Sequence, residues 1–374
     1  MWELLTDEKA RLIWDQTLAR LDDCSPFQSY AWGEYRRGLG WKPLRWVAVS
    51  AKGEITAMMQ GYLRRYLFGI GLVWSEGGPV GDLSQCDDSL QTAIARTTDL
   101  RRVYCRFRCD RKRNIEDVLL LAARQWSAPW SPLTSNYTMA LDLTRDSQQL
   151  LAGCERNWRR NLKRFQESGL TIRQWSQANA DEIHSVYLSM QGVKGLEEQH
   201  SRAEIEQLLI SLKHNLVLFR CDDESGQLIS LLGCLITGNR ACSILSATSA
   251  RGRELHASYG ILWTVLQHCR GLGVQTYDLA GIDPVRSPGV YRFKRAAGGI
   301  PMELLGEWDW ASSPWLRWLG NWAIARRNRL RQAEAVLNKS DVKKKVPNRL
   351  GPAGAQVQPD DAVLSWPGSA RQRA

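Results

Sequence analysis

The sequence predicts an α+β protein built from two successive units of similar architecture. The chain has 374 residues, a length typical of two domains. Hydrophobic residues make up 44% of it and charged residues 24%, a balance that can form a sizeable core. Each half also gives the same order of expected elements: a helix, a strand, further helices, a meander of strands, a helix and a strand.

The first unit is expected to span residues 1–149. Its helices are predicted from apolar residues at helical spacing and its strands from β-branched and aromatic runs. In chain order, helices are expected at 7–22, 27–41 and 85–97, and strands within 44–66, 69–81, 101–113 and 137–143. The run 101–113 alternates apolar and basic residues, which indicates a strand with one charged face, and 137–143 is expected to close the unit.

The second unit is expected to span residues 150–310 and to repeat the order of the first. Helices are expected at 150–170, 180–192, 201–213 and 258–273, and strands at 170–175, within 215–249 and at 276–284. The helix at 150–170 is strongly basic and ends at Gly169.

A closing helix is expected over 311–337, because Ser313 can cap it and Pro314 suits its first position. The following residues share one face: Trp315, Trp318, Leu319 and Trp322. The arginines of the next turns are Arg326, Arg327, Arg329 and Arg331. We expect this helix to pack on the first domain; a second hypothesis keeps the tryptophans partly exposed for docking on an anionic membrane. Residues 338–374, rich in Pro, Gly, Lys and Gln, are expected to form a disordered tail.

The composition restricts the class of protein. A net charge of +11 indicates either a polyanionic partner or a solvated basic surface. The N-terminus MWELLTDEKA predicts no signal peptide, and the apolar runs are shorter than a membrane span of about 20 residues. The nine cysteines are scattered without a CxxC pair and the five histidines form no cluster. We therefore expect reduced cysteines and no metal site.

Motifs for covalent catalysis are missing, since the sequence has no GxSxG elbow, P-loop or kinase set. The order strand, loop, helix over 240–270 matches the core of acetyltransferase folds, where a Q/R-x-x-G-x-G/A loop cradles the pyrophosphate of coenzyme A. Here the loop reads SARGRELHASYG. Counted from Arg253, His256 stands where glycine is expected and Ser258 at the next small position. We therefore expect a degraded pyrophosphate cradle. In the alternative interpretation, Arg251 and Arg253 merely form a surface at the start of the helix.

Four segments, in this order, resemble the FemAB/FemX family: QSYAWGEY, NWRRNLKRFQESGL, SATSARGRELHASYGILW and YDLAGIDPVRSPGVYRFKRAAGG. The last is the most specific, and the resemblance covers roughly residues 20–310. It implies two tandem acetyltransferase-like (GNAT-type) domains, each a mixed twisted sheet flanked by helices. It also implies transfer of an amino acid from aminoacyl-tRNA to the stem-peptide amine of a peptidoglycan precursor, with no cofactor.

The resemblance places Phe293 and Lys294 at the acyl-transfer site. Attack of an amine on an aminoacyl ester develops an oxyanion, which a fixed cation stabilises. Both substrates also carry phosphates that Lys294 can neutralise. Gly298 and Gly299 would let the backbone approach a ligand closely. The alternative interpretation is a solvated lysine on a surface turn.

Further substrate-binding residues are implied by the same resemblance. Arg36, with Arg37 beside it, follows QSYAWGE at the position that contacts the precursor's phosphates, and an arginine can hold a phosphate bidentately. The alternative is a helix-end arginine paired with Glu34 or with the last carbonyls of the helix. Asp278 and Asp283 can orient the amine or merely cap turns. Tyr291 belongs to the same motif.

A tRNA-binding face is expected on the basic helix, where spacings of three and four gather most of the charges on one side. Its residues are Arg156, Arg159, Arg160, Lys163 and Arg164, with Trp158 as an interleaved aromatic. A solvated basic face is the alternative interpretation.

These residues favour a cytoplasmic aminoacyltransferase of FemAB type that acts in cell-wall biogenesis. Its expected partners are aminoacyl-tRNA, a nucleotide- or lipid-linked peptidoglycan precursor and the anionic inner face of the membrane, and we expect a monomer. One alternative is a coenzyme A-dependent N-acyltransferase acting on a surface-polysaccharide or amino-sugar precursor. Another is a tRNA- or membrane-binding module without catalysis.

Overall fold

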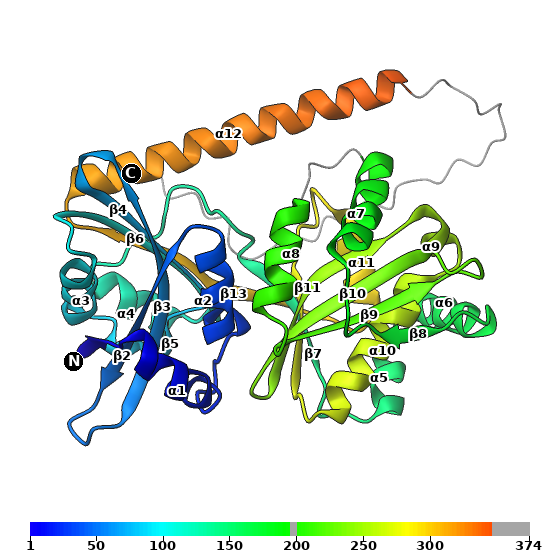
Figure 1. The fold of residues 1–374 in the computed structure, drawn as a ribbon, viewed down its shortest axis with the longest axis horizontal. Coiled ribbons are helices and arrows are strands. Elements are labelled where there is room, and N and C mark those ends of the chain that lie inside the picture. Colours follow the sequence, from blue (N-terminus) through cyan, green and yellow to red (C-terminus); the bar gives the residue numbers. More distant parts are fainter. Residues whose placement is uncertain (195–199, 346–374) are drawn as a thin grey trace.

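The first half of the structure is a twisted sheet with helices packed against it (Figure 1). This computed structural model describes residues 1–194 and 200–345. The strands of this half are β1 (Trp2–Leu4), β2 (Lys42–Val49), β3 (Ile55–Tyr66), β4 (Ile70–Glu76), β5 (Val80–Gly81) and β6 (Arg102–Lys112); its helices are α1 (Asp7–Leu18), α2 (Tyr30–Gly38), α3 (Asp88–Thr98) and α4 (Ile115–Ala123). Strands β4 and β6 pair in parallel, because α3 crosses over between them.

The second half repeats this arrangement. Its strands are β7 (Tyr137–Asp142), β8 (Ile172–Gln174), β9 (Leu216–Asp222), β10 (Leu228–Thr237), β11 (Arg240–Thr248) and β12 (Thr276–Gly281). Its helices are α5 (Ser147–Gly153), α6 (Arg156–Glu167), α7 (Ala180–Lys194), α8 (Arg202–Ser211), α9 (Ala250–Glu254), α10 (Ala257–Gly271) and α11 (Pro288–Ala296). The α+β class and the tandem architecture that the sequence predicts are confirmed by this topology.

Strand β13 (Ile300–Ala311) joins the two halves into one sheet. Its first residues pair with β7 and the rest with β6, so the described strands follow the order β1-β2-β3-β4-β6-β13-β7-β12-β11-β10-β9-β8, with β5 beside β3. The prediction that 137–143 closes the first unit was wrong, because β7 pairs with β12 and β13. Alternation along a strand shows which face is buried and gives no information on the partner strand.

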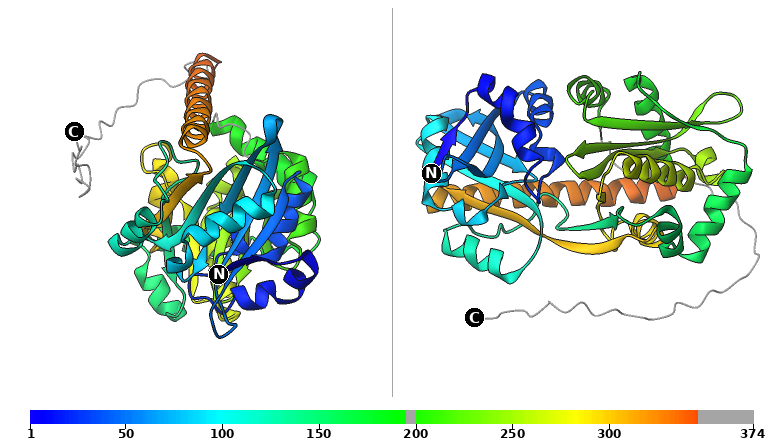
Figure 2. Two further views of the ribbon diagram at one scale, coloured as in Figure 1. Left: turned by 90° about the vertical axis from the view of Figure 1, so that its left-hand side faces the viewer. Right: turned by 90° about the horizontal axis from the view of Figure 1, so that it is seen from below.

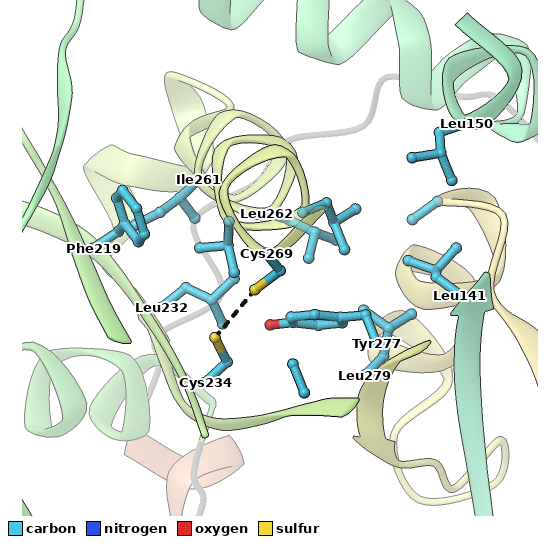
Figure 3. Packing of buried hydrophobic residues seen from close by; sticks show 14 of the residues in the cluster. Leu141, Leu150, Phe219, Leu232, Cys234, Ile261, Leu262, Cys269, Tyr277 and Leu279 are labelled. Carbon is cyan, nitrogen blue, oxygen red and sulfur yellow. Dashed lines mark hydrogen bonds between the residues drawn. The ribbon is translucent and has the colours of Figure 1, made fainter. Parts of the chain in front are cut away.

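The core of the second half lies between its sheet and helix α10. Figure 3 shows Tyr277 and Cys269 among leucines, with the Sγ atoms of Cys234 and Cys269 3.6 Å apart. Gly260 lets α10 pack closely on α6, because a Cβ there would lie 2.1 Å from the ring of Phe165. All nine cysteines are free and buried in this structure.

The closing helix, α12 (Pro314–Lys345), runs along the outside of the molecule (Figures 1 and 2). Ser313 caps it by accepting a hydrogen bond from the amide of Leu316. The helix continues past residue 337, where the tail was expected to begin, and residues 346–374 lie outside the described part of the chain. Within the described residues, no helix is long and apolar enough to span a bilayer.

Candidate functional site

The centre of the site lies where β11 and β12 separate. The two strands pair in parallel from Arg240–Thr276 to Cys242–Asp278, and the ladder ends there. On its other side β12 pairs with β7, but the register shifts between Asp278 and Gly281, and Ala280 is left-handed with a φ of +64°. The strand therefore bends directly after Asp278, which places this carboxylate at an irregular, polar break in the sheet.

Two donors hold the Asp278 carboxylate at this break. Its Oδ1 accepts hydrogen bonds from the hydroxyl of Thr138 on β7 and from the amide of Ala280, the latter at 2.7 Å. Burial raises the pKa of Asp278, and Asp110 adds to the increase, although Thr138, Ala280 and Arg108 act in the opposite direction. Thr138 and Ala280 therefore fix the orientation of the Asp278 carboxylate, as is required of a residue that positions the backbone at this bend.

Lys294 reaches the same break from α11. From the sequence, Lys294 in the segment GVYRFKRAAGG could lie either on a surface turn or at the acyl-transfer site. In the structure this segment is mostly helical, and Lys294 lies in the last turn of α11. Its Nζ donates to the carbonyl oxygens of Ala280 and Gly281, both at 2.9 Å. Burial lowers the pKa of the ammonium to about 8, while Asp278 and Cys242 pull it upward. The lysine is thus a fixed, partly desolvated cation and differs from a solvated turn residue.

Phe293 points elsewhere, because adjacent residues on a helix are about 100° apart. Its ring packs edge-on against Tyr259 at 5.1 Å and lines an open pocket of about 570 Å³. The other lining residues are Glu155, Asn157, Trp158, Tyr259, Gly289, Arg292, Arg295 and Ala296. One face of α11 therefore borders this pocket, and another face carries Lys294 to the break in the sheet.

The other predicted residues of this motif have more local contacts. Asp283 accepts hydrogen bonds from the amides of Val285 and Arg286, which is the arrangement of a turn former. Tyr291 packs against the core of the second half. Gly299 allows a close approach within the chain itself, since a Cβ there would lie 2.7 Å from the carbonyl oxygen of Lys294.

Arg36 and Arg37 lie on different sides of α2. Arg36 donates to the carboxylate of Glu76, with 3.1 Å between Nε and Oε2, and its guanidinium lies 5.4 Å from the ring centre of Trp32. Arg37 is exposed and pairs with Glu34 at 2.8 Å, as the alternative interpretation of a helix-end arginine expected. Only Arg36 is therefore directed toward the polar interior.

Arg108 and Asp110 on β6 are residues that sequence reasoning missed. Arg108 Nε donates to Asp110 at 2.9 Å, and Asp110 also accepts from the hydroxyl of Ser25 at 2.8 Å. The charges of both residues act on Asp278, so the first half contributes to the same polar cluster. The sequence did hold a signal: Asp110 is the single acidic residue in the alternating run 101–113.

Glu76 connects Arg36 with this cluster. Burial alone would raise the pKa of Glu76, but Arg36 and Arg108 together hold it below its ordinary value. The charged groups from Arg36 to Lys294 thus form a row across the junction of the two halves. We refer to Arg36, Glu76, Arg108, Asp110, Asp278 and Lys294 as the junction cluster.

The basic residues of α6 are all exposed, but they differ in their contacts. Arg159 donates to the carbonyls of Ala152 and Cys154, and Arg160 donates to Asn157. Arg156 and Arg164 form no hydrogen bond or ion pair with other described residues. Trp158 is 1% exposed, so the prediction that it interleaves with the charges on a binding face was wrong.

The loop expected to be a degraded pyrophosphate cradle is instead partly helical. Ser249 caps the short helix α9, and His256 follows in a left-handed conformation, with a φ of +57°, at the start of α10. Four amides of this segment are bonded locally: those of Gly252 and Arg253 to Ser249, that of Leu255 to Arg251 and that of His256 to Arg253. In residues 1–194 and 200–345, no group of three or more His, Cys, Asp or Glu side chains is placed to hold a metal ion.

Comparison with known proteins agrees with this architecture. Residues 152–295 match the family described as the acetyltransferase (GNAT) domain, and no curated protein matches the chain. The structure is similar to FemX, with a TM-score of 0.69 and 16% identity over 83% of this chain and 96% of that chain.

Two further solved structures share the fold. The C-terminal domain of a putative lysylphosphatidylglycerol synthetase from Agrobacterium fabrum has a TM-score of 0.52 and 15% identity over 84% of this chain and 95% of that one. A tandem GNAT protein from the clavulanic acid biosynthesis pathway has a TM-score of 0.50 and 14% identity over 84% and 99%. The predicted fold of two tandem acetyltransferase-like domains is thus confirmed.

Proposed function

We propose that this protein is an acyltransferase that moves an amino acid from aminoacyl-tRNA to the stem-peptide amine of a peptidoglycan precursor. The observation that carries the proposal is the position of Lys294 at the break between β11 and β12. A lysine ammonium has three N–H donors, and two are used by the carbonyls of Ala280 and Gly281. The third remains available, with its direction set by the other two.

The reaction needs such a donor. The acceptor nitrogen attacks the ester carbonyl carbon, a C–N bond forms, and the carbonyl oxygen becomes an oxyanion. When this tetrahedral species collapses, the bond to the ribose oxygen breaks, and the proton lost by the amine is gained by the ribose hydroxyl. Protonated Lys294 stabilises the oxyanion, while Asp278 holds the bend that carries both carbonyls.

Three further features support the assignment of substrates. The pocket beside Phe293 opens at the start of the basic helix α6, so the phosphate backbone of a donor that passes it would lie next to the exposed arginines. His256 stands where a pyrophosphate cradle needs glycine, which favours tRNA over coenzyme A. FemX shares the two-domain fold. Arg36 is the proposed phosphate contact of the acceptor, although it must share its guanidinium with Glu76.

A second candidate function is supported by the acetyltransferase family match over residues 152–295. In that case a coenzyme A thioester would be the donor, and the same lysine would stabilise the oxyanion.

Reconstitution separates the two. Purified protein is mixed with an amine-bearing muropeptide precursor and either a pool of charged tRNA or acetyl-coenzyme A, and products are identified by mass spectrometry. We expect an aminoacylated precursor with tRNA and none with acetyl-coenzyme A. Product from the thioester alone, together with tight, salt-insensitive binding of acetyl-coenzyme A in calorimetry, would reverse the assignment.

A further inference from the structure

An exposed band of tryptophan side chains runs along the first turns of α12. Trp315, Trp318 and Trp322 are 62%, 48% and 45% exposed, and Trp130, in the loop after α4, is 53% exposed beside them. The rings of Trp318 and Trp322 stack at 6.3 Å, and Trp130 meets Trp318 edge-on at 6.4 Å. Large apolar side chains gathered in one exposed patch mark an interaction surface more often than a chance exposure.

Packing of α12 on the first half does not require these tryptophans. The buried side of the helix is formed by Leu316 and Asn321, with Gly320 close against the ring of Tyr104. Asp309 on β13 accepts hydrogen bonds from Arg317 and Asn321, and the same Asn321 accepts from the amide of Trp130. The helix therefore packs on the first half, as expected, but through the side of Leu316, Gly320 and Asn321, and the three tryptophans stay partly exposed, as the second hypothesis held.

Basic side chains continue the same band. At 100° per residue, Arg326 and Arg329 fall on the side of the helix that carries Trp315 and Trp322. Both arginines are exposed, and the guanidinium of Arg326 lies 5.9 Å from the ring centre of Trp322. We call Trp130, Trp315, Trp318, Trp322, Arg326 and Arg329 the tryptophan–arginine band.

We propose that the tryptophan–arginine band docks the protein on an anionic lipid surface. Tryptophan rings prefer the boundary between lipid headgroups and acyl chains, and arginines beside them meet the negative surface potential. A helix that lies flat offers all of these side chains to a plane at once, and α12 runs along the outside of the molecule (Figure 2). Nucleic acid suits the band less well, because Trp318 is already covered by two other rings where a base would stack.

The band is also connected with the junction cluster. Strand β13 leads from the end of α11, which carries Lys294, into α12. The loop that holds Trp130 leads into β7, whose Thr138 positions Asp278. Docking would thus act on the elements that flank the proposed site on both sides. The proposal itself concerns binding and does not depend on which donor or acceptor the enzyme uses.

Vesicle sedimentation at about 50 mM salt tests the proposal. The probes are vesicles of phosphatidylglycerol and phosphatidylethanolamine, with phosphatidylcholine vesicles as the neutral comparison. We expect wild-type protein to sediment only with the anionic vesicles. The double variant Arg326→Gln/Arg329→Gln should bind them roughly 20- to 30-fold more weakly, the factor expected for two basic residues near such a surface. The triple variant Trp315→Ser/Trp318→Ser/Trp322→Ser should lose binding while keeping its melting temperature.

The matched control is Arg11→Gln/Arg20→Gln, which removes two exposed charges on and just after α1, on the opposite side of the molecule (Figure 1). This variant should sediment like the wild type. Equal weakening of both arginine variants would show that only net charge matters and would overturn the proposal, as would full binding by the tryptophan variant. Two other outcomes would assign the band to a different partner, provided that the wild type does not bind vesicles. One is a wild-type dimer that dissociates in the tryptophan variant, and the other is tRNA binding that the tryptophan variant abolishes.

Discussion

The Nζ of Lys294 donates a hydrogen bond of 2.9 Å to the carbonyl oxygen of Ala280, a residue whose backbone is left-handed. A non-glycine residue pays about 1 kcal/mol or more for this conformation, so its neighbours must hold it. Asp278 does so from the other side of the same residue, by accepting a hydrogen bond from the amide of Ala280. Lysine, bend and carboxylate therefore form one unit, in which the orientation of Lys294 depends on Asp278.

Replacement of Lys294 by methionine should abolish most of the activity. If Lys294 stabilises the oxyanion, Lys294→Met lowers turnover by a factor of about 100 or more, as loss of one oxyanion donor does. The free energy of unfolding should change by only about 1 kcal/mol, because two hydrogen bonds are lost while the cost of burying a charge is relieved. Turnover is measured by mass spectrometry of the product at saturating substrate concentrations. The free energy of unfolding is measured by urea denaturation. A variant with wild-type turnover would contradict the assignment.

The protonation of Lys294 should be visible without any assay of activity. Because its pKa is lowered to about 8 by burial, the amine becomes reactive toward acetic anhydride as the pH rises through that value, well below the ordinary 10.5 of lysine. Labelling is quantified by mass spectrometry of the peptide that contains Lys294, at a series of pH values.

The variant Asp278→Asn gives this titration its control. Asp278 raises the pKa of Lys294, so its removal should move the labelling midpoint below that of the wild type. A midpoint that stays unchanged would show that the two groups are not coupled. In the enzyme assay, a protonated lysine that is required for turnover gives a loss of activity above about pH 8, and Lys294→Arg should shift that loss to higher pH.

The pairing of Arg36 with Glu76 predicts an inverted pH dependence of stability. In the wild type the pKa of Glu76 is lowered, so its contribution to stability is present above the ordinary range of a carboxyl and is lost as the pH falls. Arg36→Met leaves Glu76 without its nearest cation at a partly buried place, at a cost on the order of 2 kcal/mol. The pKa of Glu76 should then be raised, so this variant should recover stability as the pH falls.

Urea unfolding at pH 7.5 and pH 5 measures this effect, and Arg36→Met/Glu76→Gln is the control in which the recovery should vanish. If Arg36 also contacts the acceptor's phosphates, this double variant should raise the KM for the precursor even though its stability is restored. An unchanged KM would limit Arg36 to a structural role.

The sequence allowed much of the fold to be predicted, because helix and strand periodicity are local properties. It was least informative where distant partners decide the structure. The side of α12 that packs inward is selected by Asp309, a buried carboxylate that needs Arg317 and Asn321 as partners. The sequence predicted that this helix packs on the first domain, but a single sequence gives no sign of the carboxylate that selects the inward side.

The candidate site shows the same division. Lys294 and Asp278 were found through motif resemblance, but Arg108 and Asp110, whose charges act on Asp278, come from β6, more than 150 positions earlier in the chain. Arg108 and Asp110 lie near Asp278 only because β13 joins the two halves into one sheet. Phe293 and Lys294 were predicted as a pair, whereas helical geometry directs them to different places. Only the three-dimensional arrangement of α11 separates their roles.

The exposed charges of α6 provide a test of the tRNA donor. Arg156 and Arg164 make no ion pair or hydrogen bond with other described residues, whereas Arg159 is occupied by two carbonyls of α5 and the residue after it. If α6 contacts the phosphate backbone, each free arginine contributes close to one released counterion, so Arg156→Gln/Arg164→Gln should reduce the slope of log K against log salt by roughly 1.5. Binding to tRNA is measured by fluorescence anisotropy between about 50 and 200 mM salt.

The control is again Arg11→Gln/Arg20→Gln, which has the same net charge as the α6 variant and should keep the wild-type slope. Arg159→Gln should affect stability more than the salt dependence, because it releases two carbonyls at the start of α6. Since phosphate contacts carry no sequence information, the α6 variant should weaken binding equally for all tRNA species. Equal slopes for the wild type and the α6 variant would remove α6 from the donor site and leave the pocket beside Phe293 to account for donor binding by itself.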